Sequence, residues 1–165
     1  MLESSPIVSV LMPSFNSGEY IAIAIQSVIN STFQNFELII TDDNSADNTF
    51  NVAMDFASKD HRIKVYRNDK NYGDYGNRNK AASYAIGKYI KYVDHDDYIY
   101  PNGLETIVNL MEENPQASVG FFSLQQNKNQ PFPMLLTPKE IYEYNYLGPG
   151  LFFKAPLSSI ILRSS

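Results

Sequence analysis

Three carboxylates lie within four residues in the segment Asp94-His95-Asp96-Asp97. The preceding residues, 88–93, have the composition of a β-strand, so the acids are expected at a strand end. Like charges gathered in this way are costly unless a cation neutralises them. Carboxylate oxygens suit Mg²⁺ or Mn²⁺, and Mg²⁺ is usually held by one or two carboxylates together with substrate phosphates. The cluster therefore indicates a divalent cation and a ligand that carries a diphosphate.

The spacing of these acids gives a geometric prediction. Asp94 and Asp96 are separated by one residue, so an extended strand end would point both side chains to the same side. His95 would then point away, and we interpret it as packing or polar filler rather than as a ligand. The alternative for the whole segment is a solvated acidic turn.

An alternation of strands and helices must position these acids. Strands are predicted at 7–12, 34–41, 62–67, 88–93 and 117–123, and apolar residues at helical spacing lie between them. Pro13 is expected to end the first strand, and Gly87 to cap the third helix. This order predicts an α/β fold with a mostly parallel sheet and right-handed crossovers. Ligands bind such sheets at the carboxyl ends of the strands, which selects the loops 13–18, 42–47 and 94–98.

The loop after the second strand begins with Asp42-Asp43-Asn44-Ser45. The Asp43 carboxylate can accept a hydrogen bond from a nucleobase imide or a ribose hydroxyl. The alternative is a turn followed by a helix cap, with Asp47 or Asn48 capping the next helix.

Two further loops carry weaker signals. Residues 13–18 contain one glycine and no lysine, which excludes a phosphate-cradling glycine loop. Phe15 and the backbone can still form one wall of a pocket for a flat base. The alternative is an ordinary strand–helix turn. Residues 71–79 are predicted to be a polar loop entering a helix. Arg78 in this loop is placed to meet a phosphate or a base, or else to pair with a neighbouring acid.

Composition narrows the class of protein. The chain has 165 residues, 44% of them hydrophobic and 19% charged, which is typical of a globular domain. The net charge is −5 and no run of Lys or Arg occurs, which argues against nucleic acid as a partner. The absence of cysteine excludes disulfides and cysteine–zinc sites. No signal peptide is recognised, and no apolar run reaches the roughly 20 residues that would span a bilayer.

The character of the chain changes after residue 123. We expect one α/β core over 1–123 and a second region over 124–165, which the end of the chain truncates. A short helix is predicted at 138–144 and a strand at 157–162.

Taken together, four motifs resemble the family-2 glycosyltransferases, which have the Rossmann-like GT-A fold with helices on both faces of the sheet. The resemblance covers roughly residues 6–123. It is carried by Val10-Leu11-Met12-Pro13-Ser14-Phe15-Asn16, by the stretch that ends Thr41-Asp42-Asp43-Asn44-Ser45, by residues 71–79, and by Asp94-His95-Asp96-Asp97, which is similar to the Asp-x-Asp motif of the family.

The resemblance implies a role for each matching position. Pro13, Ser14 and Phe15 would line the nucleobase pocket and Asp43 would bind the base. Arg78 would help to hold the nucleotide. Asp94 would face the ribose or the donor sugar and, with Asp96, would ligate a Mn²⁺ or Mg²⁺ ion that bridges the diphosphate.

The family implies an inverting transfer from a nucleotide-diphosphate sugar, most often a UDP-sugar, to a saccharide or lipid-linked acceptor. The resemblance thus implies a donor-binding core over 1–123 and the beginning of an acceptor-side region over 124–165. In that region the apolar segments 132–136 and 147–153 can line an acceptor cleft, contact a membrane, or pack in a core. The resemblance implies a cytoplasmic protein that acts at the inner face of a membrane and associates with that membrane peripherally. The family's catalytic base lies in a downstream acidic motif that no residue here matches, so we expect it beyond residue 165 and expect little or no turnover from these residues alone.

Two other classes share some of these features. A sugar-phosphate nucleotidyltransferase would carry a Gly-rich loop with Lys or Arg after the first strand, which residues 13–18 lack. A phosphorelay receiver domain carries its acid pair after the first strand, whereas Asp42 and Asp43 follow the second. It also needs a lysine after the last parallel strand, where this chain has Ser123-Leu124-Gln125.

Overall fold

The computed structural model describes residues 5–122, 137, 139–140, 143 and 158–163. Six strands form one sheet in the order β3-β2-β1-β4-β6-β5. The strands are β1 (Val8–Ser14), β2 (Phe36–Asp42), β3 (Ile63–Arg67), β4 (Tyr89–Tyr92), β5 (Val119–Phe122) and β6 (Ser158–Leu162). The pairs β1–β2, β1–β4 and β2–β3 are parallel, while β6 runs antiparallel to both β4 and β5.

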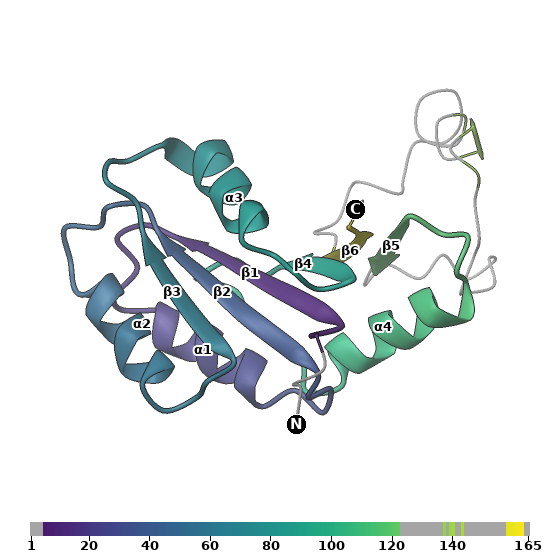
Figure 1. Cartoon of the computed structure of the whole chain (residues 1–165), viewed down its shortest axis with the longest axis horizontal. Coiled ribbons are helices and arrows are strands. Elements are labelled where there is room, and N and C mark those ends of the chain that lie inside the picture. Colours follow the sequence, from purple (N-terminus) through teal and green to yellow (C-terminus); the bar gives the residue numbers. More distant parts are fainter. Residues whose placement is uncertain (1–4, 123–136, 138, 141–142, 144–157, 164–165) are drawn as a thin grey trace.

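Helices cover both faces of this sheet. They are α1 (Ile21–Ile29), α2 (Thr49–Ala57), α3 (Gly73–Ser83) and α4 (Gly103–Glu113). Figure 1 shows α1, α2 and α4 on one side of the sheet and α3 on the other. The arrangement confirms the predicted α/β class and the mostly parallel sheet with helices on both faces.

Alternating side chains of the strands build two cores. Val8, Val10 and Met12 of β1 pack with the buried faces of α1, α2 and α4. Leu11 points to the other face, where it packs with Ala81 of α3 and with Ala85. The larger core thus lies on the α1 side, and the sheet is buried on both faces as its near-continuous apolar strands predict.

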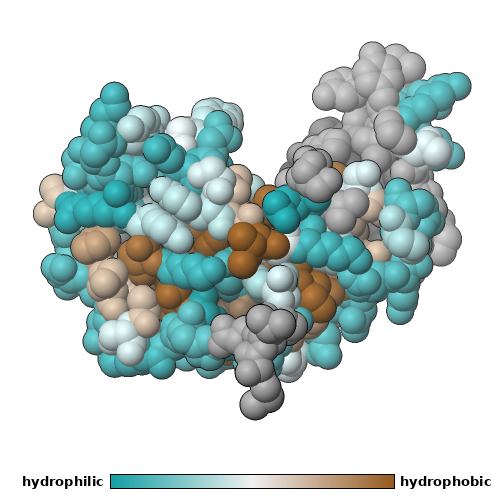
Figure 2. Space-filling view, viewed as in Figure 1, coloured by the Kyte–Doolittle hydropathy of each residue, from teal (hydrophilic) through white to brown (hydrophobic). Residues whose placement is uncertain are grey.

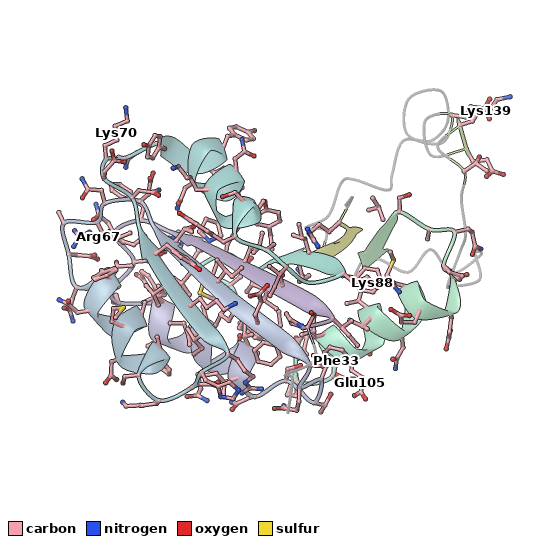
Figure 3. The ribbon with its side chains drawn as sticks, in the orientation of Figure 1. Phe33, Arg67, Lys70, Lys88, Glu105 and Lys139 are labelled. Carbon is pink, nitrogen blue, oxygen red and sulfur yellow. The ribbon has the colours of Figure 1, made fainter. Side chains whose placement is uncertain are left out.

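The two ends of the parallel strands lie at opposite edges of the sheet. Arg67 and Lys70 lie at the edge where the parallel strands end, whereas Phe33 and Glu105 lie at the opposite edge (Figure 3). In the space-filling view, hydrophobic residues show mainly as a band across the sheet between hydrophilic helical surfaces (Figure 2). Within the described part of the chain, no helix combines the length and the apolar character that crossing a bilayer requires.

Several predicted element boundaries were wrong. Strand β1 continues through Pro13 to Ser14. The last β1 residue that pairs with β4 is Leu11, so Pro13, which has no N–H, interrupts no ladder on that side. Helix α3 begins at Gly73, so most of the predicted loop 71–79 is helical. Gly87 lies outside α3, which ends at Ser83, and does not cap it.

The region after residue 123 is described only in part. The strand predicted at 157–162 is present as β6 (Ser158–Leu162), but it runs antiparallel and inserts between β4 and β5. The apolar segments 132–136 and 147–153, and most of the predicted helix 138–144, lie outside the described residues. The boundary between the two predicted domains stays a prediction.

Candidate functional site

A pocket of about 220 Å³ lies at the carboxyl edge of the sheet. Its walls come from the end of β1, the loop after β2, the beginning of α3 and the segment after β4. The lining residues are Pro13, Ser14, Phe15, Asp43, Asn71, Gly73, Asp74, Asn77 and His95. The loops after β1, β2 and β4, which the parallel-sheet rule selected from the sequence, therefore meet in one place.

Asp43 holds the beginning of α3 against the pocket. Its side chain is buried, and its carboxylate accepts hydrogen bonds from Tyr72 N at 2.9 and 3.0 Å, from Gly73 N at 2.9 Å and from Asn68 Nδ2 at 2.7 Å. These backbone amides stand at the amino end of a helix, where a negative charge is favourable. Gly73 has a φ of +74°, which a glycine adopts without strain.

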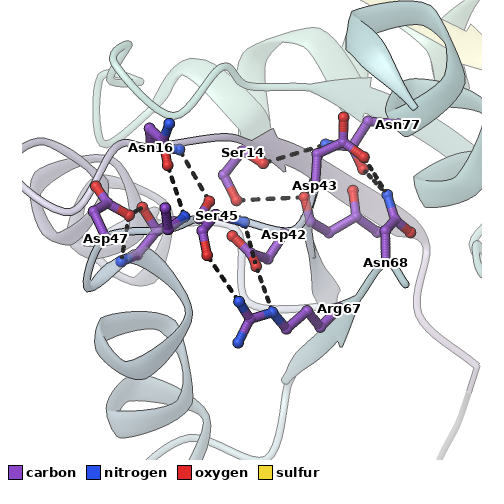
Figure 4. Close-up of polar contacts among 12 residues, drawn as sticks. Ser14, Asn16, Asp42, Asp43, Ser45, Asp47, Arg67, Asn68 and Asn77 are labelled. Atoms are coloured by element: carbon purple, nitrogen blue, oxygen red, sulfur yellow. Dashed lines mark hydrogen bonds and ion pairs between the residues drawn. The ribbon is translucent and has the colours of Figure 1, made fainter. Parts of the chain in front are cut away.

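A chain of buried amides extends from this carboxylate into the sheet (Figure 4). Asn68 Nδ2 also donates to Asn77 Oδ1 at 3.0 Å, and Asn77 Nδ2 donates to Thr41 O at 2.9 Å. Asn77 thereby ties α3 to the end of β2. Because every member is buried and bonded, the network fixes the floor of the pocket.

The loops after β1 and β2 are also tied to each other. Asn16 N donates to Ser45 Oγ at 2.9 Å, and Asn16 Oδ1 accepts from Ala46 N at 2.9 Å. Asn16 and Asn44 have positive φ angles of 48° and 60°, a region that Asn tolerates better than most residues. The buried Asp42 carboxylate lies 3.3 Å from Arg67 Nε and accepts from Ser45 N at 3.2 Å. These bonds hold the pocket wall in one conformation.

A capping bond at the beginning of α2 was predicted from Asp47 or Asn48, and Asp47 supplies it. Asp47 Oδ1 accepts from Thr49 N at 3.0 Å, and Asp47 Oδ2 accepts from Gly18 N at 2.9 Å. Asn48 occupies the cap position without a side-chain cap bond. Desolvation alone would raise the pKa of Asp47, but these hydrogen bonds outweigh it and hold this pKa below its usual value.

The acid segment after β4 is a turn rather than an extended strand end. Asp97 N donates to Asp94 O at 3.0 Å, which closes the chain around His95 and Asp96. The extended geometry that would have aligned Asp94 with Asp96 is therefore wrong. Asp94 is half-buried and Asp96 is exposed, and neither side chain lines the pocket. Among the residues described by the structure, no group of three or more His, Asp or Glu is arranged to hold a metal.

Arg78 joins α3 to this turn. Its guanidinium lies 2.8 Å from Asp74 Oδ1 and 2.8 Å from Asp94 Oδ1, and 5.4 Å from the centre of the Tyr92 ring. Burial lowers the pKa of Arg78, but the charges of Asp94 and Asp74 outweigh it and raise this pKa above its usual value. The ion-pair interpretation of Arg78 is thus confirmed, and Arg78 lies beside the pocket rather than in its wall.

Comparisons with known proteins identify the family. The family model described as "Glycosyl transferase family 2" matches residues 9–165. The chain belongs to this family. The phosphorelay and nucleotidyltransferase alternatives are therefore set aside.

Two curated relatives are matched over part of their length. A glucosyltransferase of Escherichia coli, WfgD, is 40% identical over 108 residues, covering 66% of this chain and 42% of the relative. Its name gives UDP-Glc and α-D-GlcNAc-diphosphoundecaprenol as substrates. A β-1,3-glucosyltransferase of Campylobacter jejuni, named for an undecaprenol-linked acceptor, is 36% identical over 110 residues, covering 66% of this chain and 35% of the relative. The chain spans about half the length, or less, of these relatives.

A solved structure confirms the family's fold for this chain. TarS of Staphylococcus aureus, residues 1–349, superposes with a TM-score of 0.72 at 25% identity, covering 94% of this chain and 46% of TarS. The same part of TarS solved in complex with UDP-GlcNAc gives a TM-score of 0.66 at 28% identity, covering 77% of this chain and 37% of TarS. The Rossmann-like GT-A fold predicted from the motifs is therefore present.

The sequence of this family-2 domain predicts part of the pocket and not the rest. Pro13, Ser14, Phe15 and Asp43 were predicted and line it. Asn77 and His95 were not assigned to the pocket, although both line it. The one signal for Asn77 was an amide in a polar segment next to Arg78. His95 was interpreted as filler because the segment was expected to be extended.

Proposed function

We propose that this family-2 domain binds the nucleotide part of a nucleotide-diphosphate sugar and belongs to a glycosyltransferase. The carrying observation is the pocket at the carboxyl edge of the sheet, with an acid-rich turn directly beside it. TarS has been solved with UDP-GlcNAc and the name of the E. coli relative includes UDP-Glc, which supports UDP as the nucleotide.

In this proposal, the pocket residues divide the donor between them. Pro13, Ser14 and Phe15 form the wall for the base, and Phe15 is 44% exposed, which leaves its ring available for contact with a flat ligand. Asp43 orients the backbone amides of Tyr72 and Gly73. It binds the base through lone pairs of its carboxylate that these amides do not occupy. Arg78 holds Asp94 in place and brings positive charge close to the expected diphosphate.

The acid turn fits a divalent cation that is held largely by phosphate. Asp94 and Asp96 supply only carboxylate oxygens, which is the donor set of Mg²⁺ and Mn²⁺, and Asp96 is exposed and free to turn toward a ligand. A bound cation would stabilise the charge on the departing nucleoside diphosphate. Among the protein groups, Asp96 would bind the cation, and Arg78 would limit how far Asp94 moves.

The names of two relatives support a proposal for the acceptor. Two of their names specify acceptors linked to undecaprenol through diphosphate, which supports a saccharide on a lipid carrier and work close to a membrane. We propose an inverting transfer, in which the acceptor hydroxyl displaces the nucleotide directly. No residue of the described pocket is assigned as the base in this step.

Calorimetric titration tests the donor proposal without requiring turnover. UDP, GDP and dTDP would each be titrated with Mn²⁺ and with EDTA against the wild type and Asp96→Asn. We expect UDP to bind in a Mn²⁺-dependent manner, and Asp96→Asn to weaken that binding about tenfold, which corresponds to about 1.4 kcal/mol. Asp55→Asn, an exposed acid on α2, is the matched control and should bind as the wild type does. If the wild type binds none of the three nucleotides, the proposal fails.

A further inference from the structure

The parallel ladder between β1 and β4 ends in an unusual way. On the β4 side of β1, the Ile7 carbonyl accepts from Tyr89 N at 2.9 Å and the Leu11 carbonyl accepts from Val93 N at 3.0 Å. The next carbonyl on this side with the same offset along the chain is that of Pro13, and its expected donor is the backbone N–H of His95. Instead, the Pro13 carbonyl lies 3.1 Å from the His95 side chain, at Nδ1.

The use of a side-chain donor in place of the backbone N–H releases the backbone of the acid segment from the sheet. Because the imidazole occupies the place of the ladder N–H, the chain can leave β4 after Tyr92 and close the turn from Asp94 to Asp97 while it stays anchored to β1. Pro13 has no N–H of its own, so it cannot continue the ladder toward β4 from its side either. The two residues together end the strand pairing and begin the turn.

The contact also assigns the tautomer of the ring. A carbonyl oxygen only accepts, so the proton must be on Nδ1. In the neutral ring Nε2 is then an acceptor. His95 is part-buried and lines the pocket beside Pro13, Ser14 and Phe15, and it lies between the acids Asp94 and Asp96.

We propose that His95 is a positioning residue that couples the acid turn to the base-binding wall. Its Nδ1–H fixes the turn relative to Pro13, so that a nucleotide seated against the wall presents its diphosphate to the acids with a fixed separation. The inference rests on the proposed function for its effect on binding, whereas the hydrogen bond itself stands on the geometry alone. Arg78 holds the turn from the other side through Asp94.

Three substitutions separate this role from simple packing. In His95→Asn the side-chain amide places an N–H donor at the same distance along the side chain as Nδ1. In His95→Gln the donor moves one atom further out, and in His95→Phe the ring remains without a donor. The first measurement is nuclear magnetic resonance of the wild-type imidazole nitrogens, which should show the Nδ1–H form. The second is UDP affinity with Mn²⁺ and with EDTA, with thermal unfolding to confirm that each variant is folded.

We expect His95→Phe to lose about tenfold in affinity with Mn²⁺ and to change little with EDTA, because its loss is that of one hydrogen bond that orders the turn. His95→Asn should recover most of the metal-dependent affinity and His95→Gln should recover less. A ring protonated on Nε2 would overturn the inference, as would metal-dependent binding by His95→Phe that equals the wild type. If the wild type binds no nucleotide, the proposed function fails, and the tautomer still decides the hydrogen bond.

Discussion

Two buried carboxylates on this sheet have similar environments and different consequences. Asp43 is 2% exposed at the carboxyl edge, and Glu37 is 3% exposed in β2 nearer its beginning. Glu37 accepts from Ser9 Oγ at 2.6 Å and from Ile86 N at 2.9 Å, and pairs with Lys64 Nζ at 2.7 Å. Asp43 also has three donors, of which two are backbone amides and one is a side chain. Burial and hydrogen bonding alone do not distinguish a functional acid from a structural one.

The two acids differ in what their donors hold. Asp43 and one of its donors, Gly73, line a pocket, so the acid shapes a space that a ligand can enter. The donors bound by Glu37 close the sheet: Ser9 Oγ also accepts from Gly87 N at 2.8 Å, which brings the chain before β4 directly onto β1. In a parallel sheet the loops at the carboxyl ends diverge and leave a hollow, whereas this contact leaves none.

Gly87→Ala should produce the largest effect, and it should fall on stability. A Cβ at Gly87 would lie 2.5 Å from Ser9 N and 2.8 Å from Val8 C, which are backbone atoms of β1 that cannot move away alone. We expect a loss of about 3 kcal/mol or more in the free energy of unfolding, measured by urea denaturation. Gly103→Ala is the control, because the nearest atom to its Cβ would be 4.0 Å away. Equal stability of the two variants would contradict the close approach.

Lys91→Met should stabilise the protein, because Lys91 is a buried charge. Lys64 pairs with Glu37, whereas no carboxylate among the described residues lies within ion-pair distance of the Lys91 ammonium. Lys91 is 8% exposed, and burial lowers its pKa to about 8 against the opposing charges of Asp94 and Asp97. Between pH 8 and its usual pKa of 10.5, the unfolded chain binds a proton that the folded chain does not. Wild-type stability should therefore rise with pH across this window.

Removal of this charge should add about 2 kcal/mol near neutral pH and abolish the rise at alkaline pH. Both are measured by urea denaturation at a series of pH values. Lys64→Met is the matched control and should destabilise, because it leaves Glu37 without its 2.7 Å partner. A Lys91→Met variant that is less stable than the wild type at neutral pH would show that the ammonium is well satisfied.

Asp43→Asn and Glu37→Gln test the comparison directly. Each change replaces an acceptor oxygen by an NH₂ group that faces existing donors, so each should cost between about 1 and 2 kcal/mol of stability. Only Asp43→Asn should also weaken UDP binding, because Asp43 and its donor Gly73 line the pocket and Glu37 does not. Calorimetry on both variants under conditions in which both are folded checks this. Equal loss of binding in both would mean that the pocket depends on the sheet as a whole.

The predictable part of this site came from the sheet. Alternating strands and helices determine which loops share an edge, and this was sufficient to bring Pro13, Phe15 and Asp43 into one pocket. The unpredicted part consists of contacts between residues distant in sequence. Gly73 begins a helix in a segment rich in Gly and Asn, because Asp43 accepts the helix's first amides. Local propensity carries no record of that bond.

The geometry predicted for the acid segment 94–97 was wrong for a related reason. The spacing of Asp94 and Asp96 predicts one side only if the strand continues, and whether it continues depends on the partner of the Pro13 carbonyl. A side chain that replaces a backbone donor is visible only when both strands are in place. The roles assigned to Arg78, Asp94 and Asp96 in binding a donor stay predictions, while their proximity to the pocket follows from the fold.

Acidification should give the smallest and most specific difference between the two edges. Burial raises the pKa of Glu37, but hydrogen bonds from Lys64, Ser9 and Ile86 outweigh it and hold this pKa below its usual value of 4.5. The stability that Glu37 contributes is therefore complete above pH 4.5 and is lost as the pH falls through the lowered pKa of the folded state. Protonation preserves the volume and most contacts of the side chain, so this loss should be smaller than that in Glu37→Gln.

Urea denaturation at a series of acidic pH values should show a steeper decline in the wild type than in Glu37→Gln, while Asp96→Asn, altered at an exposed acid, should follow the wild type. Parallel curves for the wild type and Glu37→Gln would mean that Glu37 contributes through shape alone, and the contrast between the two edges would then rest on the pocket and not on the charge.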